Sequence, residues 1–459
     1  MNNIFSAKKS IVPAGLFVIL ILIYLPWVTM NNPVLLLSFI AFIVCLMVAV
    51  GAKGSSLIII AIGMCIPVVI GSDESTKVFF ASHFNWLIRT VYFCLLAVFF
   101  YYVFINKKKC SYQNFPSNTL VIISIMVLIN ALRFDEVNTW AYKILTVPVA
   151  FYIGYRGRET WYELVKVFNI VFIIMMVYAI LDLFFQIGPY MPLKETIPVY
   201  ELALRTGGLF VNSLPLTGLL VCYHTILLID YYRTGHFRSF FVVLSLFSLF
   251  LTGSRTSFVV IALVWILFIV YLNAGLKEKG KIVGIILLVG IALFAVLWYT
   301  LQDYVVLYFN RFTEQSEEHR LSGFQTTKNI LNSNPFGVGY TGLENAFYKY
   351  AASGFIVELA TLDNMYLTFL ATNGLLFIIP FLFYLFIPLN AFSRSFHNRK
   401  YREIVMLFVP YIVCGMTFNI EAFLQMNILY FTLAGHMYRI IQNEIQNGLI
   451  NNNSKLQHA

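Results

Sequence analysis

The sequence has few charged residues. Only 11% of its 459 residues are Asp, Glu, Lys or Arg, whereas 60% are hydrophobic and the mean hydropathy is +0.80. Soluble globular domains carry roughly 25% charged residues, so this deficit excludes a soluble protein. We predict an all-α, polytopic helical membrane protein in which residues 1–459 form a single integral membrane domain.

The sequence also lacks the motifs of metal and nucleotide sites. Its six cysteines form no C-x-x-C pair and show no Cys/His spacing typical of a metal centre or a disulfide framework. It has no Walker A loop, no G-x-G-x-x-G motif that opens a helix and no D-x-D pair. We therefore expect no metal, no cofactor, no nucleotide chemistry and no ATP-driven pumping.

Long apolar runs are what the sequence has instead. Fourteen runs (range 12–14) are predicted to cross a membrane, because a spanning helix needs about 17–25 apolar residues. They lie at about 11–29, 33–52, 55–71, 87–105, 117–133, 139–155, 164–186, 209–229, 239–252, 255–273, 281–300, 364–389, 403–419 and 421–438. The third and the ninth runs are short, and the last two are nearly contiguous.

Basic residues predict the orientation, since Lys and Arg concentrate in cytoplasmic loops. With both termini in the cytoplasm, every alternate loop agrees and 19 of the 31 basic residues fall on the cytoplasmic side. Those in the loops are Lys53, Lys107, Lys108, Lys109, Arg156, Arg158, Arg233, Arg238, Lys277, Lys279, Lys281, Arg394, Arg399, Lys400 and Arg402. The net charge of +10 is thus a topology signal, and no nucleic-acid partner is indicated.

Two outer, periplasmic loops exceed a simple turn, namely 187–208 and the large late loop 301–363. Within the larger loop, Ser316 followed by two acidic residues predicts a helix start, and Asn334-Pro335 predicts its end. Leu321, Phe324 and Leu331 supply apolar residues at helical spacing, which indicates one amphipathic helix at the outer surface. The segment 440–459 is polar and Asn-rich and is predicted to be a disordered cytoplasmic tail.

Three arginines on the outer side form a candidate anion site. Arg205 and Arg255 lie at the outer ends of predicted spans, beside helix N-termini whose N–H groups attract negative charge. Arg320 opens the amphipathic helix of the large loop. Arginine suits bidentate contact with phosphate oxygens, although a single arginine at a span end also occurs as a snorkelling side chain.

Asp363 opens the twelfth predicted span and allows two interpretations. It is either the N-cap of that helix or a carboxylate that acts as a general base on a sugar hydroxyl. His319 is either a solvated loop residue or a donor to phosphate. Residues assigned a supporting role are His319, Arg311, Asn364, Tyr366, Gly337 and Gly339, the two glycines shaping a turn in the loop.

The order of these motifs resembles the O-antigen polymerase/O-antigen ligase superfamily. The ordered motifs are Arg205-x-x-Gly208-x-Phe210-x-Asn212, Leu251-Thr252-Gly253-Ser254-Arg255-Thr256, Arg320, Asn334-Pro335-Phe336-Gly337-Val338-Gly339, Asp363-Asn364-x-Tyr366-Leu367 and Asn373-Gly374-Leu375-Leu376. They cover roughly residues 200–390, while the first half matches only as a run of spans.

The resemblance implies a metal-independent glycosyltransferase at the outer face of the bacterial inner membrane. Its substrates would be undecaprenyl-pyrophosphate-linked glycans, with membrane lipid and a chain-length regulator protein as further partners. Ligases typically carry a His where this chain has Asp363, a departure that favours a polymerase over an O-antigen ligase. Arg205, Arg255 and Arg320 are assigned to the pyrophosphate, with Asp363 as the base. A transporter or flippase of lipid-linked oligosaccharide is the alternative from another class.

Overall fold

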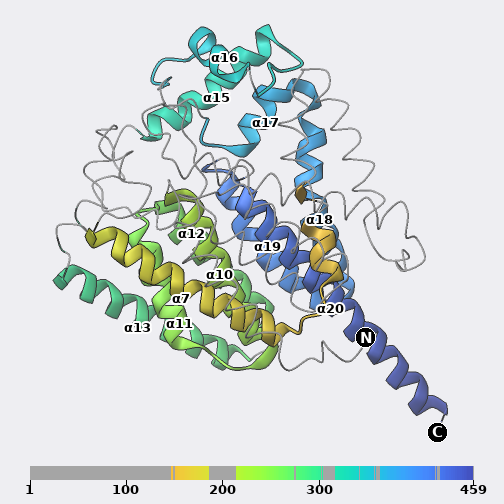
Figure 1. The fold of residues 1–459 in the computed structure, drawn as a ribbon. Helices are drawn as coiled ribbons and strands as arrows, with labels where there is room; N and C mark the ends of the chain where they lie inside the picture. Colours follow the sequence, from red (N-terminus) through yellow and green to blue (C-terminus); the bar gives the residue numbers. More distant parts are fainter. Residues whose placement is uncertain are drawn as a thin grey trace, which may run out of the picture.

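A computed structural model describes residues 146–147, 150–185, 213–272, 275–300, 302, 306, 316–340, 342–355, 357, 362–418, 420 and 424–457. Every regular element within these ranges is helical (Figure 1). The helices are α7 (Trp161–Phe185), α10 (Ser213–Thr234), α11 (Ser239–Leu251), α12 (Arg255–Tyr271), α13 (Leu276–Thr300), α15 (Ser316–Ser333), α16 (Leu343–Tyr350), α17 (Met365–Asn373), η7 (Gly374–Phe377), α18 (Ile378–His397), η8 (Arg399–Tyr401), α19 (Arg402–Gly415) and α20 (Leu424–Gln457).

Several of these helices are apolar, as expected of a helical membrane protein. Three in the described part are long and apolar enough to cross a membrane, namely 161–181 of α7, α10, and 276–296 of α13. The first five predicted spans, and residues 139–145 and 148–149 of the sixth, lie outside the described residues. Each of the eight later predicted spans contains a helix, but α11, α12 and α19 have only 13, 17 and 14 residues.

The twelfth predicted span, 364–389, is not one straight helix. Residues 365–377 and 380–397 meet at an angle of 102°. The bend begins where α17 ends at Gly374, whose φ of +58° lies in a backbone region that glycine adopts readily. Packing then holds α17 across the end of the bundle, because Met365 and Phe369 belong to the bundle core while Leu367 and Ala371 belong to a second core above it.

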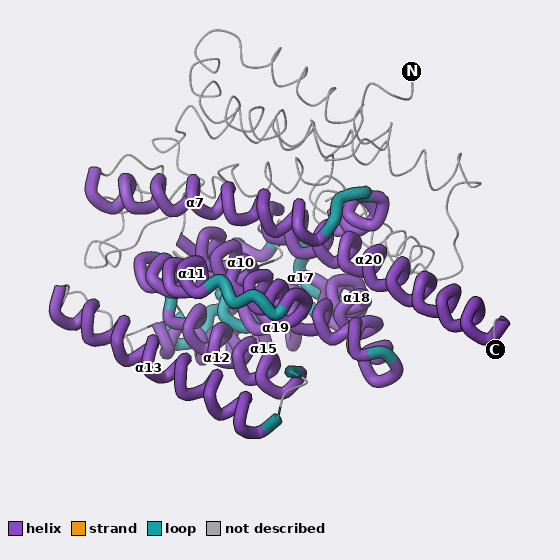
Figure 2. The backbone as a smooth tube through the Cα atoms, turned by 90° about the horizontal axis from the view of Figure 1, so that it is seen from below, coloured by secondary structure: helices purple, strands orange, loops and turns teal. Residues whose placement is uncertain are grey.

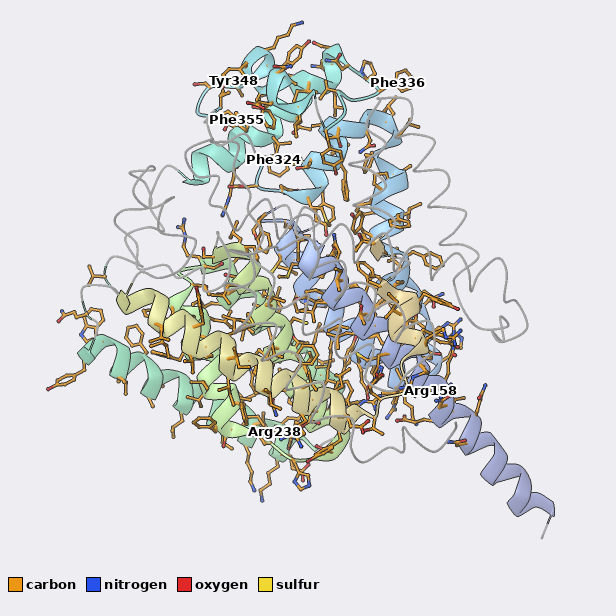
Figure 3. The ribbon with its side chains drawn as sticks, in the orientation of Figure 1. Arg158, Arg238, Phe324, Phe336, Tyr348 and Phe355 are labelled. Carbon is orange, nitrogen blue, oxygen red and sulfur yellow. The ribbon has the colours of Figure 1, made fainter. Side chains whose placement is uncertain are left out.

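The helices of the bundle alternate in direction. Trp161 at the start of α7 donates from Nε1 to Asp230 near the end of α10 at 2.9 Å, and the Arg402 guanidinium at the start of α19 lies 5.0 Å from the ring centre of Tyr271 at the end of α12. Arg158 and Arg238 lie at one end of the molecule, opposite the segment that carries Phe336 and Tyr348 (Figure 3). The pairs α7/α10 and α12/α19 are therefore antiparallel.

The bundle core is apolar and rich in aromatic side chains. Helix α10 lies at its centre, with residues 215–230 all buried, and contacts α7, α11, α12, α19 and α20. Seen from below, α10, α11 and α19 lie between α7 and α13 (Figure 2). Tyr411, Tyr430 and Phe431 pack ring against ring between α19 and α20. Burial of these rings supplies most of the packing contacts between the helices.

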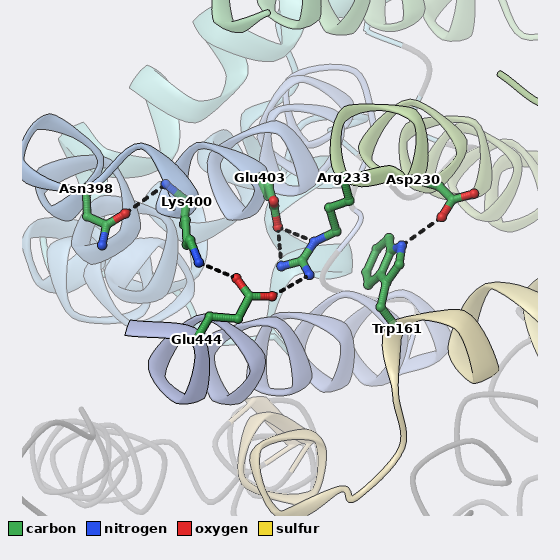
Figure 4. Close-up of polar contacts among 7 residues, drawn as sticks. All are labelled: Trp161, Asp230, Arg233, Asn398, Lys400, Glu403 and Glu444. Atoms are coloured by element: carbon green, nitrogen blue, oxygen red, sulfur yellow. Dashed lines mark hydrogen bonds and ion pairs between the residues drawn. The ribbon is translucent and has the colours of Figure 1, made fainter. Parts of the chain in front are cut away.

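A buried ion network fastens α20 to the bundle (Figure 4). Arg233 at the end of α10 contacts Glu403 at 2.6 Å and Glu444 at 3.2 Å, and its guanidinium lies 5.0 Å from the ring centre of Trp161. Lys400 adds a second contact to Glu444 at 2.7 Å. The arginine therefore joins α10, α19 and α20 through charge-assisted hydrogen bonds.

We expect Arg233→Ala to lower the free energy of unfolding by about 3–5 kcal/mol, because the change leaves Glu403 buried without its cation. Lys400→Ala is the matched control. Its side chain is 44% exposed, so the loss should be about 0–1 kcal/mol. Thermal unfolding of the two purified variants in one detergent measures the difference, and equal losses would show that burial does not strengthen the Arg233 contacts.

The same network holds the first part of the segment 440–459, for which the composition predicts a disordered tail. Helix α20 continues to Gln457. Ile441 is buried, Gln442 accepts a hydrogen bond from Tyr155 Oη at 2.6 Å, and Glu444 joins the ion network. Once these residues are held in a helix, each further residue adds to an existing nucleus, which is far easier than starting a new helix.

Candidate functional site

The start of α12 and the end of α19 lie at the same end of the bundle. The two helices pack against each other, and the contact between Arg402 and Tyr271 joins their opposite ends. At 1.5 Å per residue, α12 is about 25 Å long and α19 about 21 Å long. Arg255, the first residue of α12, therefore lies near the level of Gly415, the last residue of α19.

Two side chains fasten the start of α17 to this end of α19. Asn364 donates from Nδ2 to the carbonyl oxygen of Met416 at 3.0 Å, and Tyr366 Oη donates to the carbonyl oxygen of Ile412 at 2.9 Å. Met365 packs against Gly415, where a β-carbon would lie 2.9 Å from the Met365 Cε. Asp363, which directly precedes Asn364, is thereby held at the same end of the bundle as Arg255.

Helix α15 runs alongside α17 in the same direction. Near its start, a β-carbon on Gly323 would lie 3.7 Å from the side chain and the carbonyl oxygen of Leu362. Beyond its end, Val338 N–H donates to the carbonyl oxygen of Ala371 at 3.1 Å. Arg320 lies one turn before Gly323, and residues three apart share a helix face. Arg320 therefore shares a helix face with Gly323, the residue that lies next to Leu362.

A backbone clamp fixes this alignment of the two helices. Gly339 N–H donates to the carbonyl oxygen of Thr372 at 3.0 Å, and Leu375 N–H donates to that of Pro335 at 2.9 Å. Gly337 has φ +79°, and a β-carbon there would lie 2.3 Å from the Thr372 oxygen. The two glycine motifs of the sequence thus contact each other directly, and the turn predicted around Gly337 and Gly339 is present.

A small second core covers the clamp. Ile330, Leu343, Phe347, Phe355 and Leu367 pack together and join α15, α16 and α17. Thr326 Oγ1 accepts from Ala352 N–H at 3.0 Å, and Asn329 Nδ2 donates to the carbonyl oxygen of Tyr350 at 3.1 Å. A hydrogen bond with the Asn334 side chain lowers the pKa of the Tyr350 hydroxyl. These contacts make α15 and α16 a fixed cap above α17.

Helix α15 has the predicted boundaries, but Leu321 and Phe324 of its predicted apolar face do not belong to this core. The buried face consists of Ser322, Thr326, Thr327 and Ile330. Leu321 is 71% exposed and Phe324 is 57% exposed. The threonines pack because their hydroxyls are satisfied within the structure, as Thr327 Oγ1 donates to the Gly323 carbonyl oxygen at 2.8 Å.

The three candidate charged residues that the structure describes differ in their surroundings. Arg255 is half-buried at the first position of α12, where no side chain caps the helix start. Arg320 is half-buried, and its Nε is shielded from solvent with no hydrogen-bond partner among the described residues. A shielded guanidinium nitrogen without an acceptor is unfavourable, so Arg320 is suited to binding an anion.

Asp363 is not the N-cap of α17. That position belongs to Asn364, whose Oδ1 accepts from the N–H groups of Tyr366 at 2.9 Å and Leu367 at 3.1 Å. Asp363 precedes the cap with φ +47°, and it is the one non-glycine residue with positive φ in the described ranges. Asp and Asn adopt this conformation more readily than other side chains do, yet strained residues of this kind occur preferentially at functional sites.

The structure describes only some of the remaining candidate residues. Arg205 and Arg311 lie outside the described residues, and the position of the His319 side chain is not described although its backbone belongs to α15. Tyr366 and Asn364 have supporting positions, since each hydrogen-bonds to α19. The clamp between the glycine motifs was not predicted from the sequence, because spacing alone does not show which two turns meet.

We expect Gly337→Ala to lower the free energy of unfolding by about 2–5 kcal/mol, since it adds both backbone strain and a clash with Thr372. Gly235→Ala is the matched control. Gly235 has φ +72°, but a β-carbon there would meet nothing within 4 Å, so only the strain of about 1–2 kcal/mol remains. Thermal unfolding compares them, and equal losses would contradict a tight contact between the motifs.

Comparison with protein families identifies the segment that carries this site. Residues 240–382 match the O-antigen ligase family model. The match runs from α11 into α18 and includes Arg255, Arg320 and Asp363, whereas Arg205 precedes it. It is consistent with the O-antigen polymerase/ligase superfamily that the sequence motifs resemble. A search of curated proteins found none that matches the chain significantly.

The family match agrees with the geometry of the site. Members of the O-antigen ligase family are glycosyltransferase-like membrane enzymes, and the family implies a lipid-linked glycan as substrate. Its matched segment contains the helix start at Arg255, the Arg320 helix and both glycine motifs of the clamp. Of the three arginines that the sequence assigned to an anion site, Arg255 and Arg320 therefore lie in the matched segment, whereas Arg205 does not.

Proposed function

We propose that the protein polymerises undecaprenyl-pyrophosphate-linked repeat units of O-antigen or a related surface polysaccharide. The reaction takes place at the periplasmic face of the bacterial inner membrane. The growing chain passes from its lipid carrier to the non-reducing end of a new lipid-linked repeat unit. The observation that carries this proposal is the shielded, unpartnered Arg320 Nε on the same side of the molecule as Asp363 and the uncapped start of α12.

The chemistry requires little beyond positioning and charge. The bond between the anomeric carbon and the pyrophosphate oxygen breaks, and a bond forms between that carbon and the acceptor hydroxyl oxygen. Arg205, Arg255 and Arg320 bind the pyrophosphate and stabilise the negative charge that develops on it. Asp363 takes the proton of the acceptor hydroxyl, and undecaprenyl pyrophosphate leaves. Holding the two lipid-linked sugars in line supplies much of the rate enhancement.

An O-antigen ligase is the second candidate, and the matched family bears that description. A ligase would transfer the same glycan to lipid A–core. The carboxylate at position 363 favours the polymerase, because the ligases typically carry a histidine there. A flippase is disfavoured, since the candidate charged residues gather at one end of the bundle, whereas a transporter requires access from both sides.

Deletion of the gene followed by gel analysis of lipopolysaccharide tests the proposal. We expect core carrying a single repeat unit, with the ladder of longer chains lost and restored by the wild-type gene. Bare core with long lipid-linked polymer accumulating would identify a ligase. An unchanged ladder would contradict both transferase functions. Co-purification of a chain-length regulator protein with the tagged polymerase would test the remaining predicted partner.

A further inference from the structure

The start of α12 contains a hydroxyl group that does not cap the helix. Ser254 is the N-cap residue and is 8% exposed, yet its side chain makes no capping hydrogen bond. Two hydroxyls nearby are engaged, since Thr252 Oγ1 donates to the Leu249 carbonyl oxygen at 2.7 Å and Ser257 Oγ donates to that of Ser254 at 2.6 Å. Ser254 Oγ has no hydrogen-bond partner among the described residues.

This hydroxyl lies where an anion is favoured. The first N–H groups of a helix have no acceptor within the helix, and the helix dipole places partial positive charge there. Gly253 precedes Ser254 with φ +64°, which turns the chain sharply from α11 into α12. Arg255 follows directly. By contrast, the start of α17 is closed to a ligand, because Asn364 Oδ1 already accepts from two of its N–H groups.

We propose that Ser254 Oγ and the first-turn N–H groups of α12 bind a phosphoryl oxygen of the polyprenyl pyrophosphate carrier. The inference rests on the proposed function and extends it to a residue outside the arginine set. Because Arg320 is assigned to the same pyrophosphate, we expect a diphosphate carrier to bind more tightly than a monophosphate carrier.

Binding measurements on the full-length protein in lipid nanodiscs test this inference. The probes are undecaprenyl pyrophosphate, undecaprenyl phosphate and inorganic pyrophosphate. We expect Ser254→Ala to weaken binding of undecaprenyl pyrophosphate about 10-fold and to raise the donor KM by a similar factor, as a lost hydrogen bond to a charged group does. The melting temperature should not fall, because the hydroxyl has no partner to lose.

Ser257→Ala is the matched control within the same motif. Its hydroxyl already donates a hydrogen bond to the Ser254 carbonyl oxygen. This variant should therefore have a lower melting temperature, while its Kd for undecaprenyl pyrophosphate stays at the wild-type value. Ser254→Thr retains a hydroxyl and should bind the carrier nearly as the wild type does. Ser254→Gly removes the hydroxyl but keeps an accepted N-cap residue, which provides a second test should the alanine variant fold poorly.

Three outcomes would overturn the inference: wild-type Kd and KM in both Ser254→Ala and Ser254→Gly, a lower melting temperature in both, or an effect on inorganic pyrophosphate alone. Failure of the proposed function is a separate result. A wild-type protein that binds the carrier through Ser254 but forms no polymer would contradict the polymerase and support the binding site. Polymer formation at the wild-type rate in the Ser254 variants would support the polymerase and contradict the binding site.

Discussion

Replacement of Arg320 by alanine should abolish long polysaccharide chains while the protein still inserts into the membrane. The Arg320 Nε is shielded and has no hydrogen-bond partner among the described residues, so its loss breaks no hydrogen bond of that atom within the described fold. Removal of one group that stabilises developing charge typically lowers the rate 10²–10³-fold, and a drop of about that size is expected. Chain-length ladders from a complemented deletion strain measure it, alongside protein abundance in the membrane.

Two further variants define what Arg320 contributes. Arg320→Lys keeps the positive charge but loses the planar guanidinium that contacts two phosphate oxygens at once. We expect shorter chains than in the wild type, in a yield between those of the wild type and Arg320→Ala. Lys328→Ala removes an exposed charge from the same helix and should leave the ladder normal. Arg255→Ala should resemble Arg320→Ala. A normal ladder from the Arg205, Arg255 and Arg320 triple alanine variant would refute the assignment of all three to the pyrophosphate.

Asp363→Asn should lower polymerisation by about 10²–10⁴-fold, the usual contribution of a general base. The change is conservative for the fold. Asparagine adopts a positive φ about as readily as aspartate does, and Asn364 already caps α17, so no capping interaction depends on the carboxylate. Initial rates of chain extension in isolated membranes provide the measurement.

Glu344→Gln is the control for the loss of a carboxylate from the same loop. Glu344 lies exposed in the first turn of α16, away from the clamp, and its replacement should leave the rate unchanged. Wild-type activity in Asp363→Asn would show that position 363 takes no proton, and the base would then be sought elsewhere. Equal losses in both variants would indicate a general effect of loop charge.

Sequence patterns predicted the parts of the fold that depend on local chemistry. The helix 316–333 follows from its cap-like start and the Asn334-Pro335 stop. The bend in the segment 364–389 was missed because its apolar composition fits one long span equally well. Only the tertiary contact between Gly374 and the Pro335–Gly337 turn distinguishes two helices from one.

The candidate site was predictable as a set of residue types but not as an arrangement. The arginines stood out because positive charge is rare on the predicted outer side. The sequence could not show that Asn364 rather than Asp363 caps α17, since either side chain can cap a helix. Likewise, the disordered tail was predicted for 440–459 because composition does not reveal that Glu444 meets Arg233 from another helix.

Reconstitution of the purified protein in lipid nanodiscs, with one undecaprenyl-pyrophosphate-linked repeat unit as the sole glycan, tests the central claim most directly. The proposed function predicts a ladder of lipid-linked oligomers, with one undecaprenyl pyrophosphate released for every linkage formed and no nucleotide required. The ladder should be absent with Arg320→Ala. Transfer that occurs only when lipid A–core is supplied, or no transfer by an intact protein, would contradict a polymerase.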